Sequence, residues 1–320
     1  MTAVAPEQTL EAPIEAPVQG KTPWQLFWTR FKKDKAALMG LAMVVILFVL
    51  ALTAPLFVKI TGHGPNELFS REMTDEFGLP KGPNKDFWFG ADRPGRDVFV
   101  RVIYGARTSL LVALVATGFA VFVGVVLGVV AGYFGGKLDT LISRTIDVIL
   151  SMPILLFAIG IAAACGASAA GCLGGLIKPG LWVVIFIIAL FSWPYIARIV
   201  RGNTLSIREK EFIEAARSLG AGNVRIMFRE VLPNLVAPII VYATLIIPSN
   251  ILFEAALSFL GLGVPQTTPS WGRMLSDAAP IFDVAWWLMV FPGAFLIATT
   301  LAFNLLGDGL RDAFDPRSDR

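Results

Sequence analysis

Residues 108–136 read TSLLVALVATGFAVFVGVVLGVVAGYFGG and hold no charged side chain. About 20 consecutive apolar residues are enough for one helix to cross a bilayer. In hydrocarbon only helices and closed barrels satisfy every backbone hydrogen-bonding group, and a barrel strand alternates apolar and polar residues, which this run does not. The segment is therefore predicted to be a membrane-spanning helix.

Five further runs share this uncharged, apolar character: 36–58, 148–177, 179–197, 231–253 and 284–307. The composition agrees, with 55% hydrophobic and 16% charged residues, where a soluble domain has about 25% charged residues. The run 148–177 is too long for one span, and its second half, rich in Gly, Ala and Ser, is predicted to be a loop. These runs predict an all-α polytopic membrane protein with six transmembrane helices.

The distribution of Lys and Arg predicts the orientation, because basic residues accumulate in cytoplasmic segments. With the N-terminus inside, the cytoplasmic segments hold 17 basic residues, the long outer loop holds 8 and the two short outer loops hold 1 each. Both termini are therefore predicted to be cytoplasmic. The predicted parts are a disordered cytoplasmic tail (1–23), an N-terminal segment with the first transmembrane helix (24–58), an extracytoplasmic loop (59–107), a core of five transmembrane helices (108–310) and a cytoplasmic tail (311–320).

The end of the long outer loop changes character at Asp97. Apolar Val98, Val102 and Ile103 recur at helical spacing, with Arg101 among them. An amphipathic helix of this kind can lie in the membrane interface. We therefore predict an interfacial helix at the end of this loop, ahead of the second span.

Four glycines recur every four residues in the second span, at positions 124, 128, 132 and 136. Residues at this spacing lie on one face of a helix. Small residues there allow two helices in lipid to approach closely. The pattern favours tight packing on a neighbouring helix over the alternative, a groove that lines a pore.

The two cysteines, Cys165 and Cys172, lie in the small-residue loop after the third span. The predicted topology places this loop outside, where disulfides persist. Free cysteines also occur as small apolar residues, and a disulfide requires suitable geometry. A disulfide and two free thiols fit the sequence equally well.

Glu254 is the one carboxylate that stands between apolar stretches. A charge in hydrocarbon is costly, so such a residue is a candidate for the transport path or for an interhelix contact. Because it follows the run 231–253, a place at the outer interface fits equally well. A secondary transporter would need more ionisable residues of this kind.

The sequence lacks the residue clusters of an enzyme. Its single histidine, His63, lies in a Gly/Pro loop without other metal ligands at the usual spacing. Gly20-Lys21-Thr22 matches only the end of a phosphate-binding loop, because Glu15 replaces the first glycine. We predict no catalytic residue, no metal site and no cofactor in this chain, and its net charge of +3 requires no nucleic acid.

A polar segment, EFIEAARSLGAGNVRIMFREVLP (211–233), separates two apolar blocks. Ser206 and Glu209 have the spacing of a capping box, which predicts a short helix that Gly220 ends in the left-handed conformation. A second short helix is predicted from Val224. Two helices joined at glycine would project from the membrane as a knob. The alternative is a loop whose arginines only fix the topology.

The spacing of Glu214-Ala215-Ala216, Gly220 and Leu232-Pro233 resembles the EAA loop of ATP-binding-cassette (ABC) importer permeases. Glu230 departs from the Ile of that pattern. Other segments resemble the peptide/nickel permeases of the DppC/OppC-like subunit type: 89–92 with 95–99, 104–110, 254–263, 269–272 and 304–312. Together they extend the resemblance over roughly residues 24–316.

The resemblance implies a type I ABC importer permease fold in the bacterial inner membrane. The implied partners are membrane lipid, a second homologous permease, two ABC ATPase subunits that bind ATP and Mg, and an extracytoplasmic substrate-binding protein. The chain would then be a transport subunit without an ATP site of its own, coupled to the ATPases through the loop 201–230. The residues expected to couple are Glu214, Ala215, Ala216, Arg217 and Gly220.

The resemblance also extends to the outer side and to the solute. Arg96, Asp97 and Trp271 are expected to contact the binding protein or to line the outer mouth, although capping of a helix is the favoured alternative for Asp97. The implied solutes are di- or oligopeptides or similar small solutes. Nickel complexes, glutathione or another non-peptide solute are the alternatives.

Overall fold

The computed structural model describes residues 22–167 and 171–315, which are almost entirely helical, with isolated β-bridges as the only strand-like pairing in these ranges. Five long helices are apolar enough to cross a membrane. They are α2 (Lys35–Thr61), α4 (Val98–Phe134), α7 (Leu181–Arg208), α10 (Leu232–Phe259) and α12 (Trp287–Phe314). The shorter helices are α1 (Pro23–Phe31), α3 (Ser70–Met73), α5 (Gly136–Ser151), α6 (Ile154–Ala167), α8 (Glu211–Ser218), α9 (Asn223–Ile226) and α11 (Trp271–Ala278).

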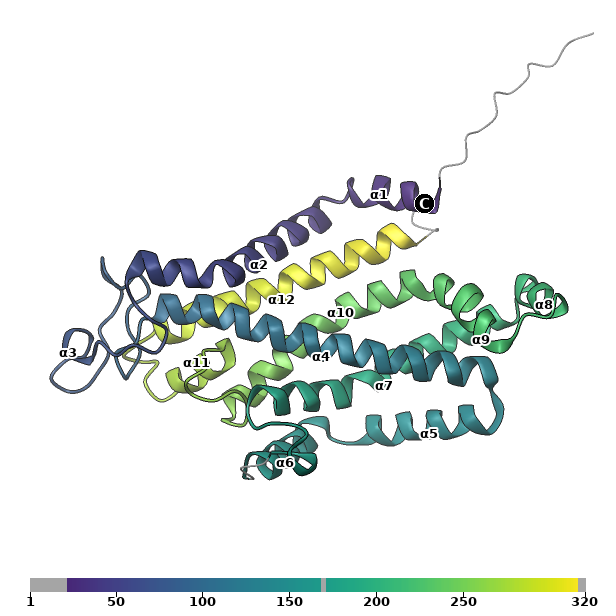
Figure 1. Cartoon of the computed structure of the whole chain (residues 1–320). Helices are drawn as coiled ribbons and strands as arrows, with labels where there is room; N and C mark the ends of the chain where they lie inside the picture. The colour runs from purple at the N-terminus through teal and green to yellow at the C-terminus, as the bar shows by residue number, and fades with distance from the viewer. Residues whose placement is uncertain (1–21, 168–170, 316–320) are drawn as a thin grey trace, which may run out of the picture.

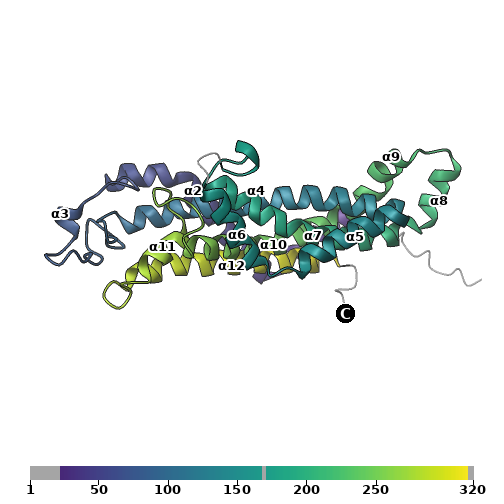
Figure 2. The same cartoon turned by 90° about the horizontal axis from the view of Figure 1, so that it is seen from below.

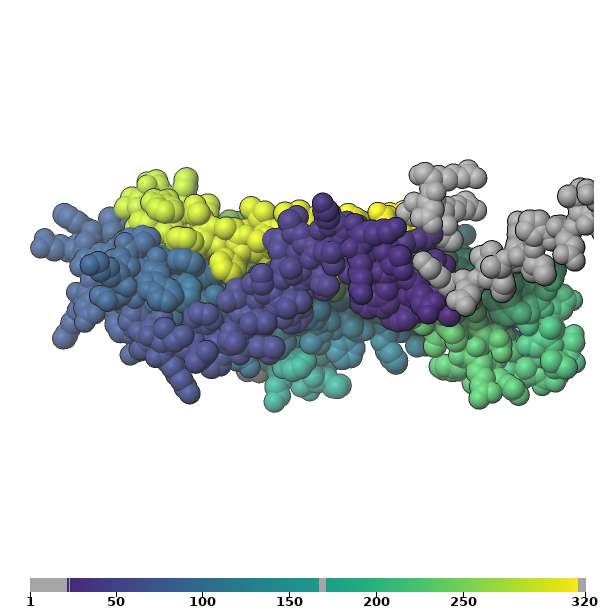
Figure 3. All heavy atoms as spheres, turned by 90° about the horizontal axis from the view of Figure 1, so that it is seen from above, coloured from purple at the N-terminus to yellow at the C-terminus, as the bar shows by residue number. Residues whose placement is uncertain are grey.

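The long helices run side by side as an elongated bundle (Figure 1). α4 packs along α7, α12 packs on α2 and α10, and α10 also contacts α4 and α7. Both views place α3 and α11 at one end and α8 and α9 at the other (Figures 1 and 2). Helix α1 and the end of α12 point toward the α8 end, which the predicted topology makes the cytoplasmic end, and α1 and α2 lie alongside α12 on one face (Figure 3).

Polar residues set several helix ends. Thr22 and Gln25 form a reciprocal capping box at the start of α1, with bonds of 3.0 and 3.3 Å. The Asp34 carboxylate accepts bonds from two backbone N–H groups at the start of α2, and Gly62 ends that helix with φ of 73°. Such caps satisfy backbone groups that a helix leaves unpaired at its ends.

The glycine repeat of α4 forms the contact with α7. A Cβ atom added at Gly124 or Gly132 would lie 2.7 Å from the Cβ of Ile196 or of Thr204, and one at Gly128 would lie 2.7 Å from the carbonyl oxygen of Ala197. The repeat therefore serves close packing, as the sequence favours. The fourth glycine of the repeat, at position 136, lies outside α4 and begins α5.

The third predicted span is a bent pair of helices. α5 already includes the charged residues 137–147, and α6 follows it at an angle of 87°. The break falls at Met152, whose φ of −77° and ψ of 142° are extended, because Pro153 disfavours a helical conformation in the preceding residue. With this pair as one span, the structure has six spans. The predicted loop begins later than expected, because α6 continues to Ala167.

Two further predictions at helix ends are wrong. The interfacial helix expected at 97–107 is the first part of α4, and its side chains from Val98 to Ile103 are buried on all sides. An amphipathic sequence pattern shows only that one side of a helix is apolar. It does not show that the outer loop covers the polar side. Similarly, the capping box at Ser206 does not form, because α7 continues to Arg208 and α8 begins after Lys210 without a side-chain cap.

The α4–α7 contact predicts opposite effects for one substitution at two positions. Gly128→Ala forces the two backbones apart, and overpacking of this kind destabilises a protein by about 1–3 kcal/mol. Gly118→Ala has no atom within 4 Å of the added methyl group and gains the higher helix propensity of alanine, up to about 1 kcal/mol. Thermal unfolding of both variants in detergent checks this. Equal melting temperatures for the two would contradict the assigned contact.

Candidate functional site

The polar segment, residues 211–233, links α7 to α10: it contains α8, α9 and a π-helical turn, Met227–Val231, and ends in the first turn of α10. Gly220 follows α8 with φ of 79°, and the N–H of the next residue, Ala221, donates to the Ala216 carbonyl oxygen at 3.0 Å. No atom lies within 4 Å of the position that a Cβ would take at Gly220. Glycine is needed there for its backbone conformation rather than for space.

The polar segment has one buried and one exposed face. Ile213 and Ile226 are fully buried and anchor α8 and α9 in the bundle. On the exposed face, the apolar side chains of Leu219, Val224 and Phe228 have exposed fractions of 89%, 64% and 65%. Glu214 and Ala215 are exposed as well. Apolar side chains clustered on a segment that faces water are typical of a surface that another protein covers.

Polar contacts tie this segment to the end of α4. The Tyr133 hydroxyl donates to Asn223 Oδ1 at 3.0 Å, and the Arg217 guanidinium lies over the Tyr133 ring at 5.6 Å from its centre. Arg208, the last residue of α7, also donates to the Gly132 carbonyl oxygen at 3.1 Å. Side chains of α8 and α9 are thus in direct contact with the end of α4.

A groove of about 680 Å³, here called the central pocket, runs along α7 and α10 beside the break between α5 and α6. Its polar side chains are Ser192, Tyr195, Tyr242, Ser249, Asn250 and Arg311. Asn250 is held between helices, because it accepts a bond from Ser192 Oγ and donates to Thr117 Oγ1, both at 2.8 Å. Polar residues at membrane depth typically line a cavity filled with water or solute.

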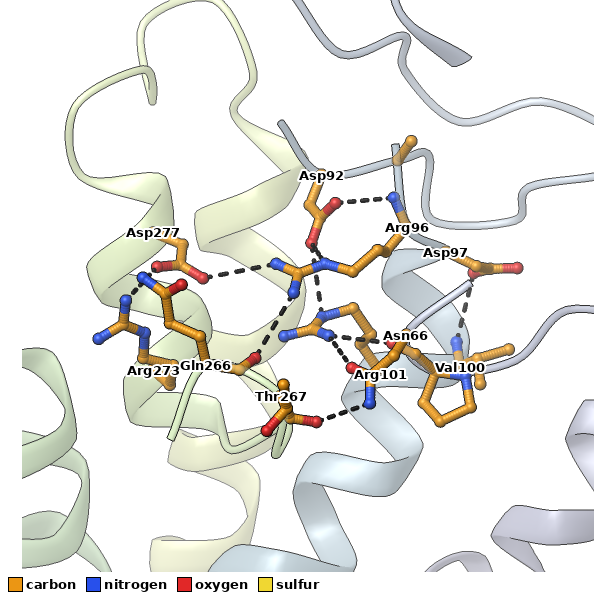
Figure 4. Close-up of polar contacts among 12 residues, drawn as sticks. Asn66, Asp92, Arg96, Asp97, Val100, Arg101, Gln266, Thr267, Arg273 and Asp277 are labelled. Carbon is orange, nitrogen blue, oxygen red and sulfur yellow. Dashed lines mark hydrogen bonds and ion pairs between the residues drawn. The ribbon is translucent and has the colours of Figure 1, made fainter. Parts of the chain in front are cut away.

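The outer end carries a group of charged residues, here called the outer charge cluster: Asp92, Arg96, Arg101, Arg273 and Asp277 (Figure 4). Arg96 Nε donates to Asp92 Oδ2 at 2.7 Å, and Arg96 Nη2 lies 3.7 Å from Asp277 Oδ2. Arg273 Nη2 lies 3.2 Å from Asp277 Oδ1. The cluster joins the outer loop, α4 and α11.

Burial governs the electrostatics of this cluster. Arg101, on the first turn of α4, is fully buried, and its Nε lies 3.5 Å from Asp92 Oδ2. Burial raises the pKa of the Asp92 carboxyl, and the Arg101 and Arg96 guanidinium groups oppose that rise. Removal from water thus affects this carboxyl more strongly than its two positive neighbours do.

Two known protein families match the chain. The family described as "Binding-protein-dependent transport system inner membrane component" matches residues 124–320. The chain belongs to this family. A second family description, "N-terminal TM domain of oligopeptide transport permease C", matches residues 22–72 of the permease. The permease is thus a multi-pass protein of the inner membrane.

Curated relatives match the permease over nearly its whole length. It is 40% identical to the dipeptide transport system permease protein DppC of Alkalihalophilus pseudofirmus, over 95% of this chain and 93% of the relative. It is 41% identical to the glutathione transport system permease protein GsiD of Escherichia coli O6:K15:H31, over 95% and 94%. DppC of Bacillus subtilis is 40% identical, over 92% and 85%.

A solved structure shares the fold. A chain of the MetNI methionine ABC transporter, in an inward facing conformation, superposes with a TM-score of 0.56 at 20% sequence identity. The match covers 67% of the permease and 97% of that chain. The predicted ABC importer permease fold is confirmed.

Arg96, Asp97 and Trp271, the three residues expected at the outer mouth, lie in different surroundings in the structure. Asp97 is buried and caps α4 by accepting from the backbone N–H groups of Phe99 and Val100, at 2.8 and 3.3 Å. This is the capping role that the sequence favours for Asp97. Arg96 pairs with Asp92 and Asp277, and its contact with a binding protein stays a prediction.

Trp271 is fully buried, and its indole N–H donates to the Val102 carbonyl oxygen at 3.0 Å. The expectation that Trp271 contacts a docked protein is therefore wrong. The sequence shows an indole in an outer loop, but it does not show that α11 folds this side chain onto α4.

Glu254 makes an interhelix contact. It is fully buried and accepts bonds from Ser109 Oγ of α4 at 2.9 Å and from Ser258 Oγ, one turn further along α10, at 2.7 Å. It lies neither at an exposed interface nor in the wall of the central pocket.

Cys165 and Cys172 are joined as a disulfide, with their Cα atoms 4.9 Å apart. The bond links the end of α6 to the short bridge between Cys172 and Ile177. Both cysteine side chains are buried against α7 and its neighbours.

Sequence reasoning missed the residues of the central pocket and the role of Arg101. Ser192 and Tyr242 stand singly within apolar runs and Asn250 has only Ser249 as a polar neighbour, so no local pattern distinguishes them. An uncharged polar residue in the middle of a span was the available signal. Among residues 22–167 and 171–315, no group of His, Cys, Asp and Glu side chains could hold a metal ion.

The capping role of Asp97 predicts a difference between two substitutions. Asp97→Asn keeps a side-chain oxygen that can accept from the start of α4, whereas Asp97→Ala removes it, which costs about 1 kcal/mol or more. The alanine variant is also expected to lose the contact with His63 Nδ1, now at 2.7 Å. Thermal unfolding should show a lower melting temperature for alanine than for asparagine. Equal loss in both variants would show that the charge, not the cap, is required.

Proposed function

We propose that the permease forms part of a translocation path for small peptides and is driven by cytoplasmic ATPase subunits that bind the polar segment. The observation that carries this proposal is the exposed face of α8 and α9, with its apolar side chains in a segment predicted to face the cytoplasm. The partners inferred from the family are two ATPase subunits that bind ATP and Mg, a second permease and an extracytoplasmic binding protein.

The polar segment supports a coupling role through its shape. The small side chain of Ala215 and the turn at Gly220 leave a low surface beside the protruding Leu219, which a groove in an ATPase subunit could enclose. Glu214 supplies charge at the edge of this surface. Arg217 is also expected to couple the permease to the ATPases. It lies over the ring of Tyr133, so a movement of α8 would act on α4 through this contact.

The central pocket supports the path. It is a groove on one side of a single chain, and a second permease packed on that side would close it into a channel. Its uncharged polar groups can exchange hydrogen bonds with peptide amides, and Arg311 can interact with a carboxylate. Pro194 and Pro248 lie in the two helices of this wall, where helices can bend between two arrangements.

The proposed solute class is a di- or oligopeptide. Two of the relatives described above are named for dipeptide transport. Glutathione is the second candidate, because GsiD is as similar to the permease as the dipeptide permeases are. Both solutes combine amides with carboxylates, which suits the pocket lining.

Two glycines of the polar segment provide a matched test of coupling. Gly220→Val places a β-branched residue at φ of 79°, which costs roughly 1–2 kcal/mol. Gly222→Val adds the same side chain at φ of −70°, a conformation that valine adopts. Neither position has an atom within 4 Å of the added Cβ.

Peptide uptake by the complex in proteoliposomes, together with copurification of the ATPase subunits, gives the measurement. Because about 1.4 kcal/mol corresponds to tenfold, Gly220→Val should lower uptake by about that factor, while Gly222→Val remains near the parent protein. Normal uptake and ATPase binding in Gly220→Val would contradict coupling through this segment.

The path is tested by thiol accessibility in a background that carries Cys165→Ser and Cys172→Ser. A water-soluble thiol reagent should modify Tyr242→Cys or Ser249→Cys in the assembled transporter, with protection by a transported peptide. Leu52→Cys on α2, exposed in the chain at 76%, should react poorly because this position faces lipid. Similar labelling at all three positions, without protection by peptide, would contradict the assigned path.

A further inference from the structure

A second pocket, of about 370 Å³, lies at the opposite end of the molecule from the polar segment. It forms where the turn at 92–96, the start of α4 and α11 meet. All five residues of the outer charge cluster line it, together with Arg93. Met274, Pro280 and Leu288 supply an apolar part of the wall.

Positive charge exceeds negative charge around this pocket. The guanidinium groups of Arg96, Arg101 and Arg273 share two carboxylates, those of Asp92 and Asp277. Arg96 spans both carboxylates, at 2.7 and 3.7 Å. Within the outer charge cluster, three guanidinium groups and two carboxylates leave one positive charge without a counter-ion, and Arg93 adds a further, exposed positive charge. A buried charge is costly unless it is paired.

Hydrogen bonding is incomplete at the same place. Arg101 Nη1 donates to the Pro65 carbonyl oxygen at 2.9 Å and to Asn66 Oδ1 at 3.1 Å. Within residues 22–167 and 171–315, Arg101 Nε and Nη2 and Arg273 Nε are the buried side-chain atoms without a hydrogen-bond partner. In Figure 4 the free end of Arg101 points toward Arg96 and Gln266, on the side of the pocket.

From this charge imbalance and these unpaired N–H groups, we propose that the outer pocket binds a carboxylate carried on a short aliphatic stem. A single carboxylate supplies the one missing negative charge, and its two oxygens suit the forked N–H groups of arginine. Met274 and Leu288 provide apolar contact for the stem.

Two sources share this chemistry. One is the terminal carboxylate of a peptide that waits at the outer side, and the other is a Glu or Asp side chain of a protein docked there. The site itself is independent of the proposed coupling and path, because it lies at the other end of α4. The test of the carboxylate site can therefore succeed or fail separately from the tests of the coupling and of the path.

The first experiment uses the full-length permease in lipid nanodiscs with butyrate as the probe and butyramide as its uncharged counterpart, at constant ionic strength. Butyrate should raise the melting temperature with saturation, and butyramide should not. Arg273→Gln should weaken the apparent butyrate affinity at least roughly tenfold, because a charge-assisted bond is lost. Arg71→Gln, an exposed position on α3 outside the pocket, should leave the affinity unchanged.

No stabilisation by butyrate, equal stabilisation by butyramide, or an unchanged affinity in Arg273→Gln would each overturn the proposal. If Arg273→Gln fails to fold, a measurement on the unsubstituted protein still tests the carboxylate site. Phenylglyoxal modifies arginine side chains, and peptide mass spectrometry can follow its reaction at Arg273. Butyrate should slow this reaction at Arg273 but not at Arg71, and equal rates with and without butyrate would also overturn the site.

The source of the carboxylate is distinguished by Ala-Ala and its C-terminal amide. Tighter binding of the free acid than of the amide, lost in Arg273→Gln, assigns the pocket to a peptide terminus. Binding of butyrate without any preference between the two dipeptides assigns it to an acidic side chain of a docked protein. Both results support the carboxylate site.

Discussion

The close contact between α4 and α7 is the constraint on which the rest of the structure depends. In lipid, apolar burial gives little preference for one helix neighbour over another, because the surrounding chains are apolar too. Gly124, Gly128 and Gly132 instead bring the α4 backbone against α7, which fixes the register of the two helices. That register places Tyr133 beside Asn223 at one end of the bundle. Further along α4, it places Thr117 where Asn250 can bond to it at 2.8 Å.

Features that depend on neighbours in the sequence, or on lipid, could be predicted from the sequence. The uncharged runs correspond to the spanning helices, since hydrocarbon requires that composition. The four-residue glycine repeat predicted a packed face, and Gly220 predicted the left-handed end of α8. Each of these requirements acts within a few residues of the chain, so the local pattern carries it.

Features that depend on contacts between distant segments could not be predicted. Arg101 has the pattern of an interfacial residue, yet its bonds go to Pro65 and Asn66, more than thirty residues away. Trp271 bonds to Val102 across 169 positions. Pro153 explains the break between α5 and α6, but the angle of 87° between these helices depends on how α6 packs on α7. For the same reason the central pocket could not be predicted, because its lining comes from five helices, α5, α6, α7, α10 and α12.

The 37 residues of α4 contain no proline, whereas α2, α7, α10 and α12 all have proline inside the helix. Proline removes a backbone hydrogen bond and makes a helix bend at that point. At 1.5 Å per residue, α4 is a strut about 55 Å long, with Asp97 at one end and Tyr133 near the other. Tyr133, near one end of this helix, contacts α8 and α9, and Arg101, near the other end, lines the outer pocket. A single helix without a proline bend therefore joins the polar segment to the arginines of the outer pocket.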